Sequence, residues 1–256
     1  MKRTIIIGDV HGCYEELCEL IEKLRIDWVE DRLIFVGDLV DRGPEPIKVI
    51  QMLRALKAEC TVGNHDERYL RYRKHMKRKA EDPSYVIPMQ APYGGRMAMF
   101  ESLTEEDWAW LESLPIHIRI DENWVVIHAG LEPGLRVEKQ DPGVVLHGRY
   151  IRKSTGRMER VLSNISASEA CVWPELWDGR DNIIYGHMVT QTRMPVINLS
   201  PSGALCVGID TGCCFGGALT AMILLEDGYS FTFQSVKARQ QYEDDAAGYI
   251  AATTLR

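Results

Sequence analysis

The sequence predicts an α/β (α+β) fold in which two packed, mixed β-sheets are flanked by helices. Over residues 4–66, three short apolar runs typical of buried strands alternate with segments that carry apolar residues at helical spacing. From residue 196 onward, short strand patterns follow one another without helices. Strands that alternate with helices favour parallel pairing, whereas consecutive strands favour antiparallel pairing, so we expect both kinds of pair.

Length and composition favour one globular domain over residues 1–236, followed by a polar, alanine-rich tail over residues 237–256. The 256 residues are 45% hydrophobic and 26% charged, as in ordinary globular proteins. The formal net charge of -7 offers no general attraction for nucleic acids or acidic membranes. No apolar run approaches the roughly 20 residues that a membrane-spanning helix needs.

The amino terminus and the cysteines indicate a cytoplasmic protein. The apolar run near the amino terminus stops at Gly8, too short for a signal peptide, so we expect the mature chain to start at Met1. Seven cysteines without a C-x-x-C pair predict free thiols in a reducing compartment. The adjacent Cys213 and Cys214 are expected to be ordinary loop residues. Nothing in the sequence indicates an oligomeric state.

The first three predicted strands each end in polar residues suited to binding metals or phosphate. These are Asp9 and His11 after residues 4–8, Asp38, Asp41 and Arg42 after residues 33–36, and Asn64 and His65 after residues 60–62. Amphipathic helices are predicted between the strands, the first from the spacing of Leu17, Leu20 and Leu24. In open α/β sheets the carboxyl ends of the strands carry the chemistry, so we expect these side chains to meet.

Later strands deliver further candidates. Residues 123–127 precede His128, and residues 183–185 precede His187. Arg149 and Arg152 follow the apolar run at residues 144–146. Strands are also expected at residues 196–199, 205–209, 219–225 and 229–236, and we expect them to form a second, antiparallel sheet.

Residues 67–99 form a segment with its own character. Seven basic residues lie within residues 68–79, followed by a stretch with proline and glycine at residues 83–95. Such a charge run is usually a solvated helical face with a lid-like loop, and the sharper alternative is a basic surface that recruits an acidic substrate. A capping box at Thr104 to Asp107 predicts the start of another helix.

The motifs at the strand ends resemble the signature blocks of one family. Gly8-Asp9-Val10-His11-Gly12, residues 37–43 and Gly63-Asn64-His65-Asp66 are similar to the three blocks of the phosphoprotein-phosphatase family of calcineurin-like metallophosphoesterases, and His128 and His187 follow in the family's order. The resemblance implies the calcineurin-like fold and two divalent ions, Mn²⁺ first, with Fe²⁺ or Zn²⁺ also suited to these donors. The implied ligands are Asp9, His11, Asp38, Asn64, His128 and His187, with Asp38 bridging the two ions.

The resemblance also implies a mechanism. A hydroxide that bridges the two ions would attack phosphorus directly, without a phosphoenzyme. Arg42, Arg149 and Asn64 would bind the substrate phosphate, with Arg152 as the fallback for Arg149. His65 would protonate the leaving oxygen with Asp41 as its orienting partner. The sequence contains no phosphate-binding P-loop motif and no G-x-S-x-G motif for competing chemistries.

The substrate stays open among three alternatives. The first is phosphoserine or phosphothreonine in a phosphorylated protein. The second is a nucleotide polyphosphate cleaved by a symmetrical bis(5'-nucleosyl)-tetraphosphatase to two ADP, for which Tyr69 and Tyr72 would offer stacking platforms. The third, a non-catalytic phosphate-binding module, is disfavoured because every expected ligand is present.

Overall fold

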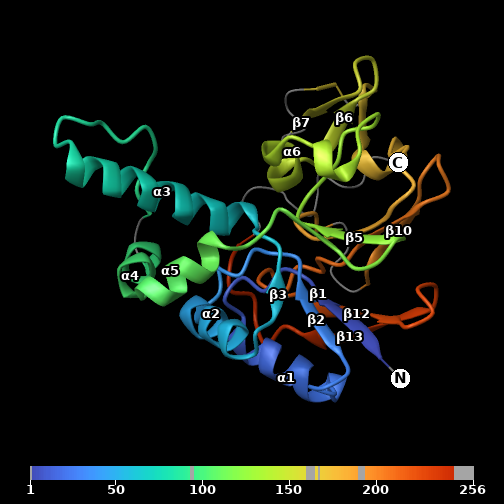
Figure 1. Ribbon diagram of the computed structural model, residues 1–256, viewed down its shortest axis with the longest axis horizontal. Helices are drawn as coiled ribbons and strands as arrows, with labels where there is room; N and C mark the ends of the chain where they lie inside the picture. Colours follow the sequence, from blue (N-terminus) through green and yellow to red (C-terminus); the bar gives the residue numbers. More distant parts are fainter. Residues whose placement is uncertain (1, 93–94, 160–164, 167, 190–193, 245–256) are drawn as a thin grey trace.

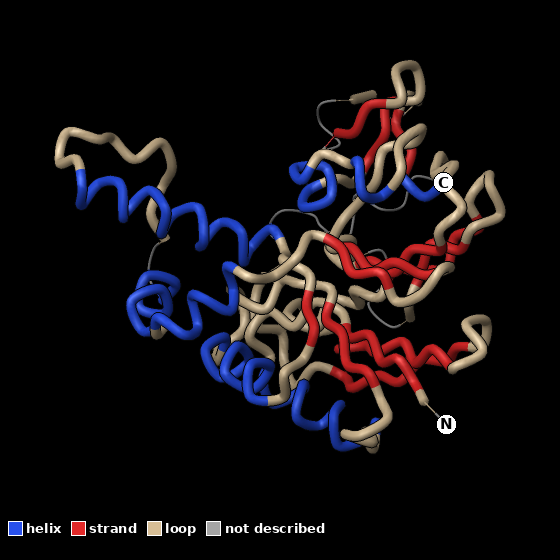
Figure 2. The backbone as a smooth tube through the Cα atoms, viewed as in Figure 1, coloured by secondary structure: helices blue, strands red, loops and turns tan. Residues whose placement is uncertain are grey.

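The computed structural model describes residues 2–92, 95–159, 165–166, 168–189 and 194–244, and these form two five-stranded sheets, a small third sheet and flanking helices. The two large sheets lie one above the other (Figure 2). The first has the order β13-β12-β1-β2-β3, the second β10-β11-β9-β5-β4 and the third β7-β6-β8. The mixed α/β class with two packed mixed sheets is confirmed.

The first sheet sets up one half of the site. Its bounds are β1 (Arg3–Ile7), β2 (Arg32–Phe35), β3 (Glu59–Cys60), β12 (Ala218–Leu225) and β13 (Phe231–Lys237). The central strand β1 pairs in parallel with β2, β2 pairs in parallel with β3, and β12 pairs antiparallel with β1. Because β1, β2 and β3 run the same way, the residues that follow them emerge at one edge.

The second sheet sets up the other half. Its bounds are β4 (His117–Arg119), β5 (Trp124–Ile127), β9 (Asn182–Tyr185), β10 (Val196–Leu199) and β11 (Leu205–Gly208). Strand β9 pairs in parallel with both β5 and β11, so His128 and His187 also leave the sheet at a common edge. Ile6 and Ile34 of the first sheet share a buried cluster with Ile184 of the second, and this apolar layer holds the two sheets face to face.

The prediction that the last four strands form one separate antiparallel sheet is wrong. Strands β10 and β11 extend the second sheet beside β9, whereas β12 and β13 complete the first sheet beside β1. The eight residues of β12 are almost entirely buried, which the apolar sequence indicated, but such a run does not specify which strand lies next to it. A third sheet, which was not expected, consists of β6 (Tyr150–Arg152), β7 (Arg157–Glu159) and β8 (Ala170–Val172).

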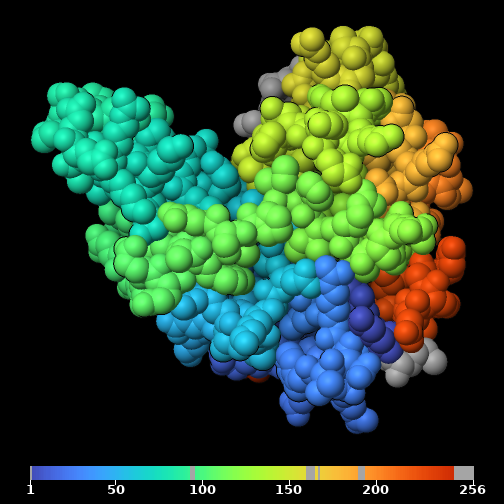
Figure 3. All heavy atoms as spheres, in the orientation of Figure 1, coloured from blue at the N-terminus to red at the C-terminus, as the bar shows by residue number. Residues whose placement is uncertain are grey.

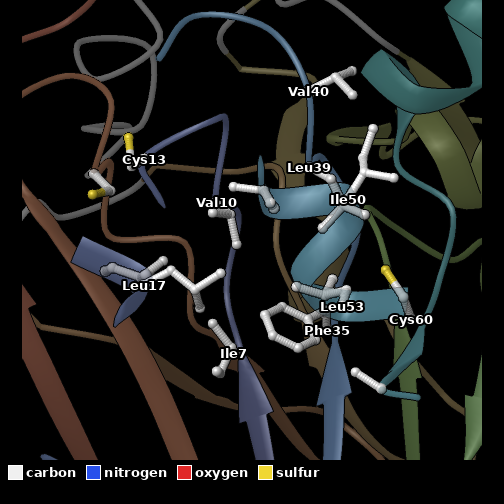
Figure 4. Packing of buried hydrophobic residues seen from close by; sticks show 14 of the residues in the cluster. Ile7, Val10, Cys13, Leu17, Phe35, Leu39, Val40, Ile50, Leu53 and Cys60 are labelled. Atoms are coloured by element: carbon white, nitrogen blue, oxygen red, sulfur yellow. The ribbon is translucent and has the colours of Figure 1, made fainter. Parts of the chain in front are cut away.

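Helices α1 (Tyr14–Leu24) and α2 (Pro46–Ala55) cover the outer face of the first sheet (Figure 1). Their apolar faces pack in one buried cluster with Ile7 and Phe35 from the strands, through residues such as Leu17 and Leu53 (Figure 4). Val10 and Leu39 belong to the same cluster, so the loops that leave β1 and β2 are themselves anchored in the core. Burial of these loop residues makes the edge of the sheet a rigid platform.

Helix α3 (Asn64–Glu81) begins directly after the third strand end and extends away from the body as an arm (Figures 1 and 3). Helices α4 (Gly95–Ser102) and α5 (Glu105–Glu112) follow it, and α6 (Pro142–His147) precedes β6. Short 3-10 turns lie at Val137–Lys139 and Trp173–Glu175. Figure 3 shows a hollow between the α3 arm and the lobe that carries α6, β6 and β7.

The basic segment is a mixture of solvated and buried side chains. Lys74, Lys77 and Arg78 are exposed, as expected of a solvated helical face. Arg73 is instead buried, forms ion pairs with Glu105 and Glu112 of α5, and lies over the ring of Trp108. This arginine therefore fastens α3 to α5 and does not belong to a substrate surface.

The expectation that Tyr69 and Tyr72 provide stacking platforms is wrong. Their side chains are 2% and 5% exposed, and both rings contact Phe100 of α4. Aromatic residues on an amphipathic helix are drawn into the core by the area they bury. In the carboxyl-terminal tail, residues 238–244 continue from β13, and residues 245–256 lie outside the described residues. Among the described residues no helix is long and apolar enough to cross a membrane.

The predicted capping box is present at the start of α5. The Asp107 carboxylate accepts hydrogen bonds from the backbone N–H and hydroxyl of Thr104, and the Thr104 hydroxyl accepts one from the Asp107 N–H. Asp107 is fully buried and also pairs with Arg54 of α2. Burial by itself would raise the pKa of this carboxyl, but the bonds from Thr104 and Arg54 hold it below its ordinary value.

We expect Asp107→Asn to lower the free energy of unfolding by about 1 to 2 kcal/mol, because a charged cap and an ion pair are lost. Since the folded-state pKa of Asp107 is depressed, its contribution is present above the unfolded pKa and disappears as the pH falls through the folded value. Urea melts should therefore separate wild type from variant at neutral pH and converge below about pH 4. The exposed neighbour Glu106, changed to glutamine, is the matched control.

Candidate active site

Six predicted ligands meet where strands of both sheets end. Their positions follow from the topology, because each lies just beyond the carboxyl end of a strand. Asp9 and His11 follow β1, Asp38 follows β2, Asn64 follows β3, His128 follows β5 and His187 follows β9. Asp9, His11, Asp38, His128 and His187 are buried, and Asn64 is half-buried.

Asp38 lies at the centre of these groups. Its Oδ2 is 3.4 Å from Nε2 of His11, and its Oδ1 is 3.5 Å from Nε2 of His128. The carboxylate belongs to two sets of donors that each lie within 4.8 Å of one another, one with His11 and His65 and one with His128 and His187. A carboxylate shared by two donor sets has the placement expected of a bridging ligand.

The histidine tautomers favour cation binding. Nδ1 of His11 lies 2.8 Å from the Val40 carbonyl oxygen, and Nδ1 of His128 lies 2.9 Å from the Val36 carbonyl oxygen. Each Nδ1–H donates to its carbonyl, which leaves Nε2 with a lone pair directed at Asp38. Nε2 of His128 also lies 2.9 Å from Oδ1 of Asn64. Nε2 of His128, Oδ1 of Asn64 and Oδ1 of Asp38 are thus three acceptors in contact without a hydrogen between them, and one metal ion would satisfy all three.

The electrostatics favour the same donor set. Burial lowers the pKa of His11, His128 and His187, so these imidazoles are neutral, which is the form that binds metals. Burial alone would raise the pKa of Asp38, but nearby positive charge, which includes that of Arg42, holds it well below its ordinary value. Neutral imidazoles with carboxylate and amide oxygens fit first-row divalent ions. The residues present thus fit a pair of such ions.

Asp9 lies outside both donor sets. Its two carboxylate oxygens accept the backbone N–H of His187 at 3.2 and 3.0 Å, and burial beside Asp210 and Asp38 raises its pKa well above the ordinary value. Gly186 makes this contact possible, since a Cβ there would lie 2.0 Å from Oδ1 of Asp9. The structure thus couples Asp9 to the His187 backbone, a link between the two sheets that the sequence did not indicate.

A second group surrounds His65. Its Nδ1 lies 2.7 Å from Oδ2 of Asp41, and its Nε2 lies 3.1 Å from Nη2 of Arg42. Tyr69 donates its hydroxyl to the other oxygen of Asp41. Burial would raise the pKa of Asp41, but the hydrogen bonds from His65 and Tyr69 hold it below its ordinary value. An ionised Asp41 orients the imidazole, so Tyr69 is a positioning residue that sequence reasoning placed in another role.

Asp66 was quoted only as part of a motif, yet it secures the site. Its carboxylate accepts the backbone N–H groups of Leu39, Val40 and Gly63 at 3.0, 3.3 and 2.9 Å. Burial and the nearby Asp38 raise its pKa to about 7. These bonds tie the start of α3 to the loop after β2. The Leu39 and Val40 N–H groups come from the loop after β2 and the Gly63 N–H from the loop after β3. No local sequence pattern indicates that these loops meet at Asp66.

The two candidate phosphate-binding arginines are placed differently. Nε of Arg149 donates to Nε2 of His187 at 2.9 Å, so its guanidinium lies at the site. Arg152 lies on β6 and pairs with Glu159 of β7 at 2.8 Å. Arg42 contacts Nε2 of His11 at 2.9 Å from the opposite side. Arg42 and Arg149 therefore flank the central carboxylate, and Arg152 is the weaker candidate.

Backbone strain is concentrated at the site. Within the described residues, seven non-glycine residues have positive φ, and five of them are at the site: His11, Asp38, Asp41, Arg42 and His187. Side chains other than glycine avoid this region because of steric contact with the backbone. Left-handed residues that persist at strand ends are typical of sites in which the surrounding fold imposes the geometry.

Comparisons with known proteins agree with this geometry. The family model for calcineurin-like phosphoesterases matches residues 2–191. A symmetrical bis(5'-nucleosyl)-tetraphosphatase of Coxiella burnetii is 34% identical over 72% of this chain, which spans only 60% of that relative. An asymmetrical bis(5'-nucleosyl)-tetraphosphatase of Halalkalibacterium halodurans is 33% identical over 92% of this chain and 94% of its own length. A crystal structure described provisionally as a diadenosine tetraphosphatase is 28% identical, with a TM-score of 0.72 over 93% of this chain and 94% of its own.

Proposed function

This chain belongs to the calcineurin-like phosphoesterase family, and from that premise we propose that it is a metal-dependent hydrolase of dinucleoside polyphosphates such as diadenosine tetraphosphate. The observation that carries the proposal is the Asp38 carboxylate shared between two sets of histidines, with an arginine on each side. Mn²⁺ is the proposed metal, as in the sequence-based expectation.

The choice of substrate departs from the first expectation. The relatives described above are named for bis(5'-nucleosyl)-tetraphosphates, and none of them for phosphoproteins. The relative that aligns with nearly the whole chain is named as the asymmetrical enzyme, so we propose ATP and AMP as the products from diadenosine tetraphosphate. The phosphoprotein reading has no comparable support.

A cavity beside the site supports a substrate larger than a single phosphate. Its volume is about 770 Å³, within the range of small-molecule sites, and its lining includes Asp41 and Arg42 of the catalytic loop. Lys48 and Arg96 of the lining form ion pairs with Glu45 and Glu243, which also line the cavity, and Met99 contributes apolar surface. A cavity of this size with an apolar wall suits the remainder of a nucleotide beyond the scissile phosphate.

The chain's own residues have distinct parts in the proposed reaction. Two divalent ions, when bound, would supply Lewis-acid charge neutralisation and activate water at neutral pH. Arg42 and Arg149 hold the phosphoryl oxygens with charge-assisted hydrogen bonds. Nε2 of His65, which faces Nη2 of Arg42 in the free protein, would once protonated give its proton to the leaving oxygen, while Asp41 keeps Nδ1 protonated and the ring in position. The buried side chains exclude bulk water from these bonds.

The test is an initial-rate comparison with Mn²⁺-reconstituted protein. We expect kcat/KM for diadenosine tetraphosphate to exceed that for a phosphothreonine peptide by at least about a hundredfold, or ~2.7 kcal/mol. Chromatography of the nucleotides identifies the cleaved bond: ATP with AMP supports the asymmetrical assignment, and two ADP would replace it with the symmetrical one. A peptide preference of the same size would overturn the proposal.

Arginine placement gives a matched pair of variants. We expect Arg149→Ala to lower kcat/KM by about a hundredfold, the usual cost of removing one donor to a developing charge. Arg152→Ala should stay within a few-fold of wild type, since Arg152 pairs with Glu159 on the strand. Metal content is measured in both variants, because Arg149 contacts His187. If Arg152→Ala loses more kcat/KM than Arg149→Ala, Arg152 rather than Arg149 binds the substrate phosphate.

A further inference from the structure

A separate group of potential metal ligands lies behind the proposed active site. Cys13 and Glu16 come from the start of α1, and Cys213 comes from the loop between β11 and β12. Their ligating atoms all lie within 4.8 Å of one another. The three residues are 0%, 0% and 2% exposed. Three donors from distant parts of the chain thus converge in the interior, where Figure 4 shows Cys13 beside the apolar core.

Glu16 provides the second, independent observation. Its Oε1 accepts the backbone N–H of Arg239 at 2.9 Å and the hydroxyl of Tyr242 at 2.8 Å. Its Oε2 is buried and has no hydrogen-bond partner. Within the described part of the chain, no lysine, arginine or histidine forms an ion pair with Glu16. A buried carboxylate oxygen without a partner is costly, and a cation placed against it removes the cost.

We propose that Cys13, Glu16 and Cys213 bind one zinc ion. Two thiolates and a carboxylate are a zinc donor set, and each thiol releases its proton to solvent when the metal binds. Zinc prefers four ligands, so the fourth position falls to water or to the Tyr242 hydroxyl beside Glu16. This site differs chemically from the proposed dinuclear centre, whose ligands are nitrogen and oxygen atoms only.

The ion would add a direct link between α1 and the loop at residues 210–217. Both already bond to residues 238–243, α1 through Glu16 and the loop through the backbone of Cys214 and Gly217. The same loop presents Cys214 to Nη1 of Arg42 at 3.8 Å and the ring of Phe215 to its guanidinium at 4.8 Å. A zinc ion at Cys213 would therefore fix the loop whose residues Cys214 and Phe215 contact Arg42.

Cobalt substitution tests the site without any assay of activity. Full-length protein produced in cobalt-supplemented medium should show a sulfur-to-cobalt charge-transfer absorption in the near ultraviolet, because only a thiolate ligand produces that band. The band should be lost in Cys213→Ser and in Glu16→Gln, an isosteric change that keeps Oε1 for Arg239 and Tyr242. It should persist in Cys171→Ser, a buried cysteine of β8, and in Asp38→Asn.

Zinc analysis of protein from ordinary medium gives the second readout. We expect Glu16→Gln to hold one equivalent of zinc less than wild type, and Cys171→Ser to hold as much as wild type, whichever metal occupies the dinuclear centre. If Cys213→Ser does not fold, Glu16→Gln decides the question by itself, with circular dichroism as the check on folding. A cobalt protein without the charge-transfer band, or a band that survives in Glu16→Gln, would overturn the proposal. Neither result would bear on the hydrolysis of dinucleotides.

Discussion

Asp38→Asn should abolish metal binding at the proposed dinuclear centre and, with it, activity. The substitution keeps the shape of the side chain but removes the negative charge that faces His11 and His128 at 3.4 and 3.5 Å. Loss of a residue that only orients a ligand costs about 10- to 100-fold in metal affinity, and a carboxylate shared by both donor sets should cost more. The measurement is metal content by mass spectrometry after dialysis, together with kcat/KM.

A surface aspartate provides the matched control. Asp141 is exposed and caps α6 through a hydrogen bond from the Gly143 N–H, a role that asparagine performs equally well. Asp141→Asn should therefore retain wild-type metal content and activity. If Asp38→Asn binds two equivalents of metal with wild-type affinity, Asp38 is not the shared ligand and the proposed arrangement is wrong.

His65→Asn should lower kcat by about 10²- to 10⁴-fold while metal content stays at the wild-type level. The reason is that Nε2 of His65 would carry the proton for the leaving oxygen, with Nδ1 held 2.7 Å from Asp41. The loss should be largest for substrates with poor leaving groups. We therefore expect a greater loss with phenyl phosphate than with p-nitrophenyl phosphate, whose leaving oxygen needs less protonation.

The leaving-group comparison separates two roles for His65. Its ring also lies within the donor set of His11 and Asp38, so a ligand role is the competing interpretation. Loss of metal in His65→Asn, with equal losses on both phenyl esters, would support the ligand role and remove the proton-transfer role. His75→Asn is the control on the same helix, because His75 bonds to Tyr85 away from the site.

Much of the site was predictable because its residues follow strands whose own patterns are strong. Short apolar runs identified β1, β2, β5 and β9, and the polar residues directly after them had to emerge at strand ends. Parallel pairing then brings Asp9 and Asp38 to one edge of the first sheet, and His128 and His187 to one edge of the second, as the structure shows. The ligand roles of these residues stay predictions until metal is measured in the variants.

Roles that depend on contacts between distant segments were not predictable. Tyr69 was expected to face a substrate base, yet its hydroxyl is bonded to Asp41 inside the protein. Arg149 and Arg152 are three residues apart and chemically alike, and only the structure places one beside His187 and the other on β6. Cys213 was expected to be an ordinary loop residue, and only the fold shows that its thiol lies within 4.8 Å of the ligating atoms of Cys13 and Glu16.

The sequence by itself determined the fold class, the order of the strands that carry the candidate ligands and the types of donor atom that these residues offer. These properties are local, since a run of four to eight residues sets a strand and its terminus. The tertiary structure alone decided that β12 and β13 join the first sheet, that Asp66 ties two loops together and that Asp9 is bonded to the His187 backbone. Each of these depends on which distant segments become neighbours, and that choice is made by packing of the whole core rather than by any local pattern.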